Sequence, residues 1–211
     1  MTIEASVPKR QRAAAFACAA VLAMTTGPAL AAGTCPAREE TFSSRLPADV
    51  MTQIGGGSAF PAGAGTLNEP KVLKAGVLFH KIRDSGGEAI GIASQMERAL
   101  VTDQGVTVQH TSWTVLIPTR GALFLQEIED VTQVRQAVER MKADPSLPSV
   151  DIQTTIGPRS DRRGVIVGGA GEFEGCTGSF VEVESIQKVD PASAVAVGIV
   201  GGVQLRVRFG S

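Results

Sequence analysis

Short runs of alternating or continuous apolar residues recur along the chain from about residue 75 to its C-terminal end. Such runs, rich in β-branched side chains, are typical of strands, and a period of two places one face of each strand in a core. Between them, the motifs SGG at 85–87, DQG at 103–105 and TRG at 119–121 fit hairpin turns. The predicted strands are 75–83, 89–100, 106–117, 122–129, 150–156, 164–167, 179–187 and 203–209.

One segment, 131–143, has the period of a helix instead. Asp130 precedes it as a candidate N-cap, and Pro145 follows as a stop. Its apolar stripe consists of Val134, Val138 and Met141. We expect one short helix inserted into an all-β domain, where it covers an edge or a mouth, or acts as a lid over a ligand. Eight strands can form a closed barrel or a sandwich.

The first 31 residues have the pattern of an export signal. A basic region with Lys9, Arg10 and Arg12 precedes an apolar stretch at 13–24 and a small-residue cleavage motif at 29–31. An uncleaved anchor is less favoured, because this apolar stretch is shorter than the roughly 20 residues that cross a bilayer. A lipoprotein is also less favoured, because a threonine precedes Cys35 where a lipobox has another residue. The sequence therefore predicts a secreted or periplasmic protein.

Residues 32–70 are rich in proline, glycine and serine and have little periodicity. We expect a flexible N-terminal arm there and the β domain at 71–211. Removal of 1–31 takes three of the 20 basic and one of the 21 acidic residues, so 17 basic against 20 acidic residues leave a net charge of −3. This charge argues against nucleic acid, and against an anionic membrane surface once the signal is cleaved, as partners.

Two cysteines, Cys35 and Cys176, remain after the signal takes Cys18. An oxidising compartment favours a disulfide between them, which would tie the arm to the glycine-rich segment. The alternative is a free, reactive Cys176, although no basic motif adjoins it in the sequence to lower its pKa.

Most catalytic motifs are absent from the sequence. It has no CxxC, HExxH, Walker or GxSxG motif, so we predict no metal site and no cofactor. The string RGVIVGGAGEFEGCTGSF at 163–180 is glycine-rich, but it lies between two strand-like runs, and its spacing differs from that of a dinucleotide-binding loop. It predicts a strand, a turn that uses positive φ angles at its glycines, and a second strand, with Phe173 and Phe180 as plugs of one barrel end.

Three segments carry a resemblance to a known family. The glycine string at 163–180 resembles the GGTGxFxGAxG signature of the allene oxide cyclase and dirigent group, VLFHKIRD at 77–84 resembles its first strand, and VQHTSWTVLIPTRG at 108–121 is similar to a later one. The resemblance implies an eight-stranded antiparallel, calycin-like barrel with a small-molecule site in its lumen. It also implies a homotrimer, which an apolar outer face with Ile90, Ile92 and Met96 would allow.

The resemblance places Lys81 and Phe79 at the first-strand site positions, and Thr114 at a pocket position. Lysine and phenylalanine there depart from the acidic or amide residues of the family, so neither allene oxide cyclisation nor orthodox dirigent activity carries over directly.

Three residues are our candidates for proton transfer: Lys81, His110 and Glu127. A desolvated lysine has a lowered pKa and can act as a base, and histidine titrates near neutrality. Alternatively, Lys81 extends to solvent, His110 is a structural residue, and Glu127 is a solvated strand residue. Phe79, Ser112 and Thr114 are the candidate ligand-binding residues.

The sequence thus favours an exported barrel that binds a small apolar or aromatic molecule. The predicted activity is that of a cyclase or isomerase, which guides cyclisation or tautomerisation of an apolar secondary metabolite by confinement and acid–base assistance. Two alternatives remain. One is a non-catalytic carrier or dirigent-like binding protein, and the other is a structural secreted barrel whose interior is filled by side chains.

Overall fold

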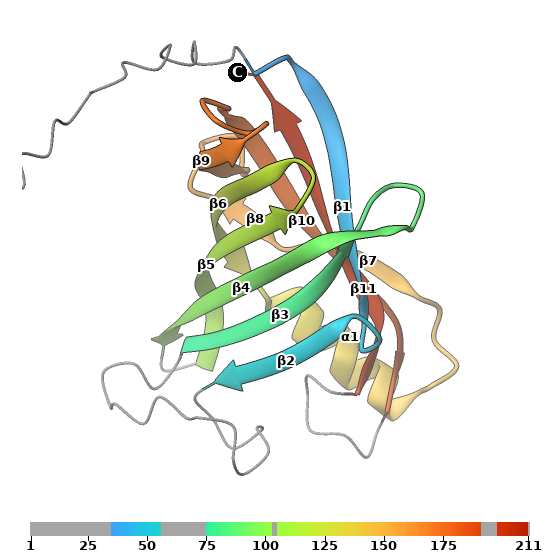
Figure 1. Ribbon diagram of the computed structural model, residues 1–211. Helices are drawn as coiled ribbons and strands as arrows, with labels where there is room; N and C mark the ends of the chain where they lie inside the picture. Colours follow the sequence, from blue (N-terminus) through green and yellow to red (C-terminus); the bar gives the residue numbers. More distant parts are fainter. Residues whose placement is uncertain (1–34, 56–74, 103–104, 191–197, 211) are drawn as a thin grey trace, which may run out of the picture. The chain divides into compact units, whose positions relative to one another are not determined.

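The computed structural model describes residues 35–55, 75–102, 105–190 and 198–210. They form a closed, eight-stranded antiparallel barrel with one short helix (Figure 1). The order around the ring is β1-β3-β4-β5-β6-β9-β10-β11, and the pair Ser43 and Arg83 joins β1 to β3 and closes it. The ring strands are β1 (Arg38–Leu46), β3 (Ala75–Arg83), β4 (Ala89–Thr102), β5 (Gly105–Ile117), β6 (Gly121–Asp130), β9 (Gly164–Gly171), β10 (Gly178–Val189) and β11 (Ile199–Phe209).

Three shorter strands extend the ring. β2 (Val50–Gly55) follows β1 after a turn and also pairs with β3. β7 (Val150–Gln153) pairs with β10, and β8 (Thr155–Gly157) pairs with β6. β7, β8 and β9 together occupy the position between β6 and β10. The chain passes from pairing with β10 to pairing with β6 at Thr154.

Seven of the eight predicted strands are ring strands, with ends that differ by a few residues, and the eighth, 150–156, is divided into β7 and β8. The arm prediction for 32–70 was wrong in part, because residues 38–55 form β1 and β2, and β1 pairs with β11 along its whole length. Its inward face is Phe42, Ser44 and Leu46, and the polar residue in the middle weakens the apolar alternation that marks a strand. The predicted signal at 1–31 and the rest of the arm lie outside the described residues.

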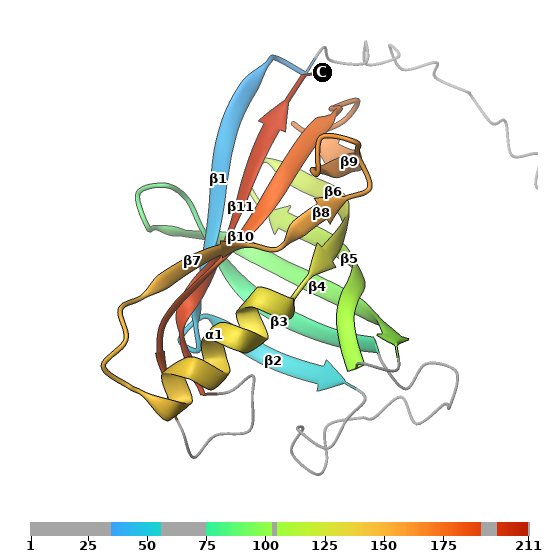
Figure 2. The ribbon, with the colours of Figure 1, turned by 180° about the vertical axis from the view of Figure 1, so that it is seen from behind.

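The predicted helix is α1 (Thr132–Ala143). Its buried stripe contains the three expected residues and Ala137, and it packs against β10 and β7 (Figure 2). The N-cap of the helix is Val131, without a side-chain cap, so the prediction of Asp130 as N-cap was wrong by one residue. Asp130 accepts a hydrogen bond from the backbone N–H of Thr132 at 2.9 Å. In the described part of the chain, no helix is both long and apolar enough to span a membrane.

The lumen near the C-terminal end of β11 is filled by apolar side chains, and we call it the apolar half. Phe173 and Phe180 are fully buried there, as the sequence predicted. The turn between β9 and β10 needs glycine at Gly171 and Gly178, where φ is +66° and +144° and an added Cβ would meet backbone atoms. Other members are Phe42, Ile82, Trp113, Val115, Ile117, Leu123, Leu125, Leu205, Val207 and Phe209.

Two features tie this end of the barrel together. Cys35 and Cys176 form the predicted disulfide, across 141 residues of sequence. Arg120 pairs with both Glu40 and Glu172, and its guanidinium lies 4.8 Å from the centre of the Phe173 ring. This end of the lumen is therefore fixed by covalent, ionic and apolar contacts together.

Candidate functional site

The other half of the lumen, which we call the carboxyl half, is lined by five glutamates. They come from three strands and occupy inward-facing positions: Glu97 on β4, Glu127 and Glu129 on β6, and Glu182 and Glu184 on β10. Because successive inward residues of a strand are two apart, Glu127 and Glu129 follow Leu123 and Leu125 on one face. Each strand thus passes from the apolar half to the carboxyl half without changing its pattern of burial.

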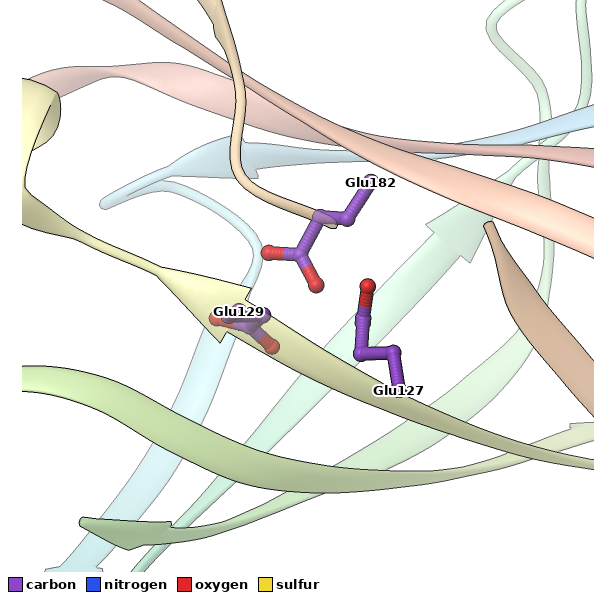
Figure 3. A group of neighbouring side chains, drawn as sticks. All are labelled: Glu127, Glu129 and Glu182. Atoms are coloured by element: carbon purple, nitrogen blue, oxygen red, sulfur yellow. The ribbon is translucent and has the colours of Figure 1, made fainter. Parts of the chain in front are cut away.

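Three of these carboxyl groups converge. Glu127, Glu129 and Glu182 each offer one oxygen within 4.8 Å of the others, and Figure 3 shows the three groups turned toward one another. Trp113 Nε1 donates to both Glu127 Oε1 and Glu182 Oε2, at 3.1 Å each. The Thr155 hydroxyl donates to Glu127 Oε2 at 2.5 Å and accepts the Glu182 backbone N–H at 2.6 Å. The cluster is therefore held in place from the strands around it.

The third carboxyl group of the cluster is less fully bonded. Gln109 Nε2 donates to Glu129 Oε2 at 2.9 Å. Burial raises the pKa of Glu129, and the nearby Thr111 and Gln109 oppose part of this rise. Glu129 Oε1 and Glu182 Oε1 have no hydrogen-bond partner among the described residues. Buried polar atoms are nearly always paired, so these oxygens are open to a further donor.

Burial raises the pKa of all five glutamates above the ordinary 4.5. It raises the pKa of Glu97 to about 8, with the charges of Glu129 and Glu184 adding to the effect. It raises that of Glu184 to about 7, where Glu129 again contributes. Burial and neighbouring carboxyl groups hold the pKa of Glu127 and Glu182 well above the ordinary value. Close carboxyl groups in such a site share protons instead of ionising together.

A cavity of about 160 Å³ opens beside the cluster. Glu97, Glu182 and Glu184 line it, and of these Glu182 is fully buried, as are Glu127 and Glu129 behind it. The lining mixes polar and apolar side chains: Leu78 lies beside Gln95 on the neighbouring strand, and Val203 lies beside Glu184. The polar lining residues are His80, Gln95, Glu97, Glu182 and Glu184, and the apolar ones are Leu46, Pro47, Val50, Leu78, Ile199 and Val203. Such a mixed lining is typical of small-molecule sites.

His80 is the imidazole of this cavity. It is fully buried, and its Nδ1 lies 3.1 Å from Ser44 Oγ. Its Nε2 has no hydrogen-bond partner among the described residues. Burial lowers the pKa of His80, against the smaller opposing effects of Gln95 and Asp49, so the ring is neutral near pH 7. A neutral ring bonded at Nδ1 offers Nε2 to a ligand as donor or acceptor, according to its tautomer.

Most of the residues proposed from the sequence lie elsewhere. The side chain of Lys81 is exposed on the outer face of β3, and Phe79 shares that face, half-buried. His110, Ser112 and Thr114 are exposed on the outer face of β5. The expected lumen position of Lys81, Phe79 and Thr114 was therefore wrong. A strand has a period of two, so a correspondence shifted by one residue exchanges its two faces.

The structure does bring three of the predicted site residues together. His110, Ser112 and Glu127 line a hollow of about 220 Å³, together with Thr111, Gln126, Ile128 and Pro158. Only Glu127, of the three candidates for proton transfer, lies in the lumen.

Sequence reasoning missed His80, Glu97, Glu129, Glu182 and Glu184. Their signal was the alternation of glutamate with apolar residues in two of the strands, IED at 128–130 after LQE at 125–127, and FVEVES at 180–185. In an antiparallel sheet this pattern is ordinarily assigned to a strand with its polar face in water. Here the glutamates face the lumen. The pattern therefore identifies the strands correctly, but the usual rule places their polar face in water, which is the wrong side.

The arrangement supports three kinds of chemistry. Carboxyl groups that titrate near pH 7 can donate and accept protons, their unpaired oxygens can bind a cation, and three converging oxygens are suited to a hard metal ion. No family model matches the chain, and no curated protein matches it. The choice among these chemistries therefore depends on the geometry of the lumen.

Proposed function

We propose that the protein is a small-molecule enzyme of the isomerase or cyclase type, which moves protons on a compact ligand held in the carboxyl half of the lumen. One observation carries this proposal: a single cavity joins the unpaired Nε2 of His80 to the carboxyl groups of Glu97, Glu182 and Glu184. General acid–base catalysis needs groups that exchange protons near the working pH, and the pKa values of Glu97 and Glu184 are about 8 and about 7.

The polar and the apolar lining residues have different roles in this proposal. Whichever of Glu97 and Glu184 is ionised removes a proton from the ligand, and the other, which is protonated, returns a proton at another position. His80 Nε2 forms a hydrogen bond to a ligand oxygen or nitrogen and fixes its orientation. The apolar lining residues contact the carbon skeleton and exclude water, which strengthens the polar contacts.

Two further observations are consistent with the sequence-based predictions. An eight-stranded antiparallel barrel is the fold that the resemblance to allene oxide cyclases and dirigent proteins implies. The disulfide suits an oxidising compartment, as secretion or a periplasmic location would provide. Membership of that family, export and a homotrimer are parts of the proposal. The proposed ligand differs from the expected purely apolar one, because five of the eleven residues that line the cavity are polar.

A carrier is the second candidate, since a protonated Glu97 can donate a hydrogen bond to a ligand that leaves unchanged. A barrel with a filled interior fits less well, because the apolar half is filled and the carboxyl half contains the cavity.

Hydrogen exchange at carbon tests the catalytic proposal. Cyclohexanone and 4-aminocyclohexanone are incubated with the protein in D₂O at pH 7.5, and deuterium at the carbons next to the carbonyl is followed by NMR. A carboxylate takes a proton from the carbon next to the carbonyl and leaves an enolate, whose oxygen His80 stabilises by a hydrogen bond. The carboxyl group exchanges this proton with D₂O and returns a deuteron to the carbon, which restores both the ketone and the carboxylate. We expect exchange about a hundredfold faster with the protein than with its Glu97→Gln variant, for at least one probe.

The matched control is Glu174→Gln, since Glu174 is exposed in the turn between β9 and β10 and faces no part of the cavity. This variant should exchange as fast as the unaltered protein. A probe that binds, as shown by the emission of Trp113, and yet exchanges no faster than with Glu97→Gln would overturn catalysis and favour the carrier.

A further inference from the structure

The charge that faces the cavity is of one sign. The titratable groups that face it or adjoin its wall are His80 on β3, Glu97 on β4, Glu127 and Glu129 on β6, and Glu182 and Glu184 on β10. None of the salt bridges between described residues involves these glutamates. Other carboxylates do have cationic partners: the buried Asp49 pairs with Arg83, and the half-buried Glu40 pairs with Arg120.

We propose that the ligand of this cavity is a compact organic cation, a protonated amine on a small apolar skeleton. The inference rests on the proposed function in placing a ligand in the cavity, and it does not require catalysis. It is carried by the cavity and by two buried atoms of its lining residues, Glu182 Oε1 and His80 Nε2, that have no hydrogen-bond partner among the described residues.

An ammonium group matches the polar side chains that line the cavity. It carries three N–H donors and a positive charge, and Glu97, Glu182 and Glu184 present acceptor oxygens from two strands. A hydrogen bond between charged groups is about twice as strong as a neutral one, and a buried charge is tolerated when it is paired. The hydrocarbon part then contacts Leu78, Ile199 and the other apolar lining residues.

Other ligand classes leave part of the site unsatisfied. An anion would face five carboxyl groups, and a pure hydrocarbon would leave Glu182 Oε1 and His80 Nε2 without partners. A metal ion between Glu127, Glu129 and Glu182 would lower the repulsion, but it would leave His80 Nε2 unpaired and the cavity unfilled. Both oxygens of Glu127 also already accept hydrogen bonds, from Trp113 and Thr155.

Cation binding should be linked to pH. A bound ammonium favours the ionised form of the carboxyl groups it touches, so binding releases protons from those that are protonated in the free protein. We expect the affinity for an amine to rise between pH 6 and pH 8, while the amine itself stays protonated.

Three probes with the same ring test the charge directly: cyclohexylamine, cyclohexanol and cyclohexanecarboxylate. Each is titrated at pH 8 into the protein with its disulfide formed, by calorimetry and by fluorescence. The chain has one tryptophan and no tyrosine, and Trp113 donates to Glu182 in the cavity wall, so its emission reports on this site. We expect the dissociation constant of cyclohexylamine to be at least tenfold lower than those of the other two.

Variants assign the effect to the lumen. Glu184→Gln should weaken cyclohexylamine at least tenfold, and Glu174→Gln should leave it unchanged. Glu184→Gln removes a buried carboxyl group whose ionisation opposes folding, so this variant should fold. Equal affinities for all three probes, or a Glu184→Gln protein that binds cyclohexylamine as well as before, would overturn the inference.

Three outcomes separate the inference from the proposed function. Binding of cyclohexanol alone, with deuterium exchange of cyclohexanone, would reject the cation and keep the enzyme. Binding of cyclohexylamine without exchange of either ketone would reject catalysis and keep the cation. Terbium emission sensitised by Trp113, abolished by Glu129→Gln and unaffected by cyclohexylamine, in a protein that does not bind cyclohexylamine, would assign the cluster to a metal ion and overturn the inference.

Discussion

The apolar half and the carboxyl half of the lumen are made by the same strands and hold opposite chemistry. On β5, Val115 and Ile117 face the apolar half, whereas Gln109 and Thr111 face the carboxyl half. On β10 the next inward-facing residue after Phe180 is Glu182, and both are fully buried. The comparison shows that polar and apolar side chains are buried equally in this barrel. The same strands therefore hold a packed apolar core in one half of the lumen and a polar site in the other.

The two halves contribute to stability with opposite signs. A fully buried phenylalanine contributes on the order of 2 kcal/mol by leaving water. A buried carboxylate without a cation costs several kcal/mol, and the group avoids part of that cost by keeping its proton. Replacing such groups by apolar residues ordinarily stabilises a protein. Glutamates at buried positions therefore oppose folding here. A binding or catalytic role would account for their presence.

The pH dependence of unfolding should separate the halves most strongly. Glu97 has an ordinary pKa of 4.5 and a folded-state pKa of about 8, so between these values the folded state holds a proton that the unfolded state releases. That stability is fully present below pH 4.5 and is lost as pH rises through about 8. The slope is about 1.4 kcal/mol per pH unit for one group, and we expect a fall of about 4 kcal/mol between pH 5 and pH 8.

Chemical denaturation in one buffer series measures this fall. Below pH 5 stability should instead fall as the pH is lowered. Hydrogen bonds from Arg83 hold the pKa of Asp49 below its usual value, and hydrogen bonds from Arg120 do the same for Glu172, so both groups lose these contacts when they are protonated. Stability should therefore be greatest near pH 5. A free energy of unfolding that rises from pH 5 to pH 8 would show that the lumen carboxyl groups are paired with cations in solution.

Truncation in the apolar half should have the next largest effect. Phe180 is fully buried, and its ring lies against Gly164, where no Cβ would fit. Phe180→Ala leaves a cavity in a closed, well-packed region, so we expect a loss of about 3 kcal/mol, equal at pH 5 and pH 8. Urea unfolding at the two pH values measures it. A strongly pH-dependent loss would mean that the two halves are coupled.

Removing one carboxyl group should have a smaller effect of opposite sign. Burial and Glu129 raise the pKa of Glu184 to about 7, so its ionised form is disfavoured at pH 8. We expect Glu184→Gln to stabilise the protein by about 2 kcal/mol at pH 8 and to change little at pH 5. Glu174→Gln, on the exposed turn, should change neither value. If Glu184→Gln destabilised the protein at pH 8, the ionised Glu184 carboxylate would have a cationic or hydrogen-bonding partner other than the residues described above.

The sequence predicted the framework of the fold well. Alternation and glycine turns identified seven of the eight ring strands and the helix, because period and turn chemistry are local properties of the chain. β1 was missed, since its inward face includes Ser44, whose partner His80 lies on another strand. A contact between distant residues leaves no local signal.

The candidate site was predicted less well, for a related reason. Periodicity shows that two faces alternate, but it does not show which of them is buried, and this barrel buries glutamates while exposing Ile92, Leu116 and Val167. The usual assignment of apolar residues to the inside therefore failed where the sequence departs from it. Glu127 was found because it was considered as a candidate base. Its neighbours Glu129 and Glu182 come together only through the closure of the barrel.

The smallest expected effect tests the residues that the sequence favoured. Lys81 and His110 are exposed on the outer wall. We expect Lys81→Met and His110→Gln each to change the free energy of unfolding by less than about 0.5 kcal/mol, as is usual for exposed positions. Binding of cyclohexylamine and deuterium exchange of the ketones should also stay unchanged, because neither side chain lines the cavity. A tenfold loss of exchange in either variant, with binding in the lumen intact, would place the chemistry on the outer wall, where His110 and Ser112 share a hollow. The carboxyl half would then act in binding alone.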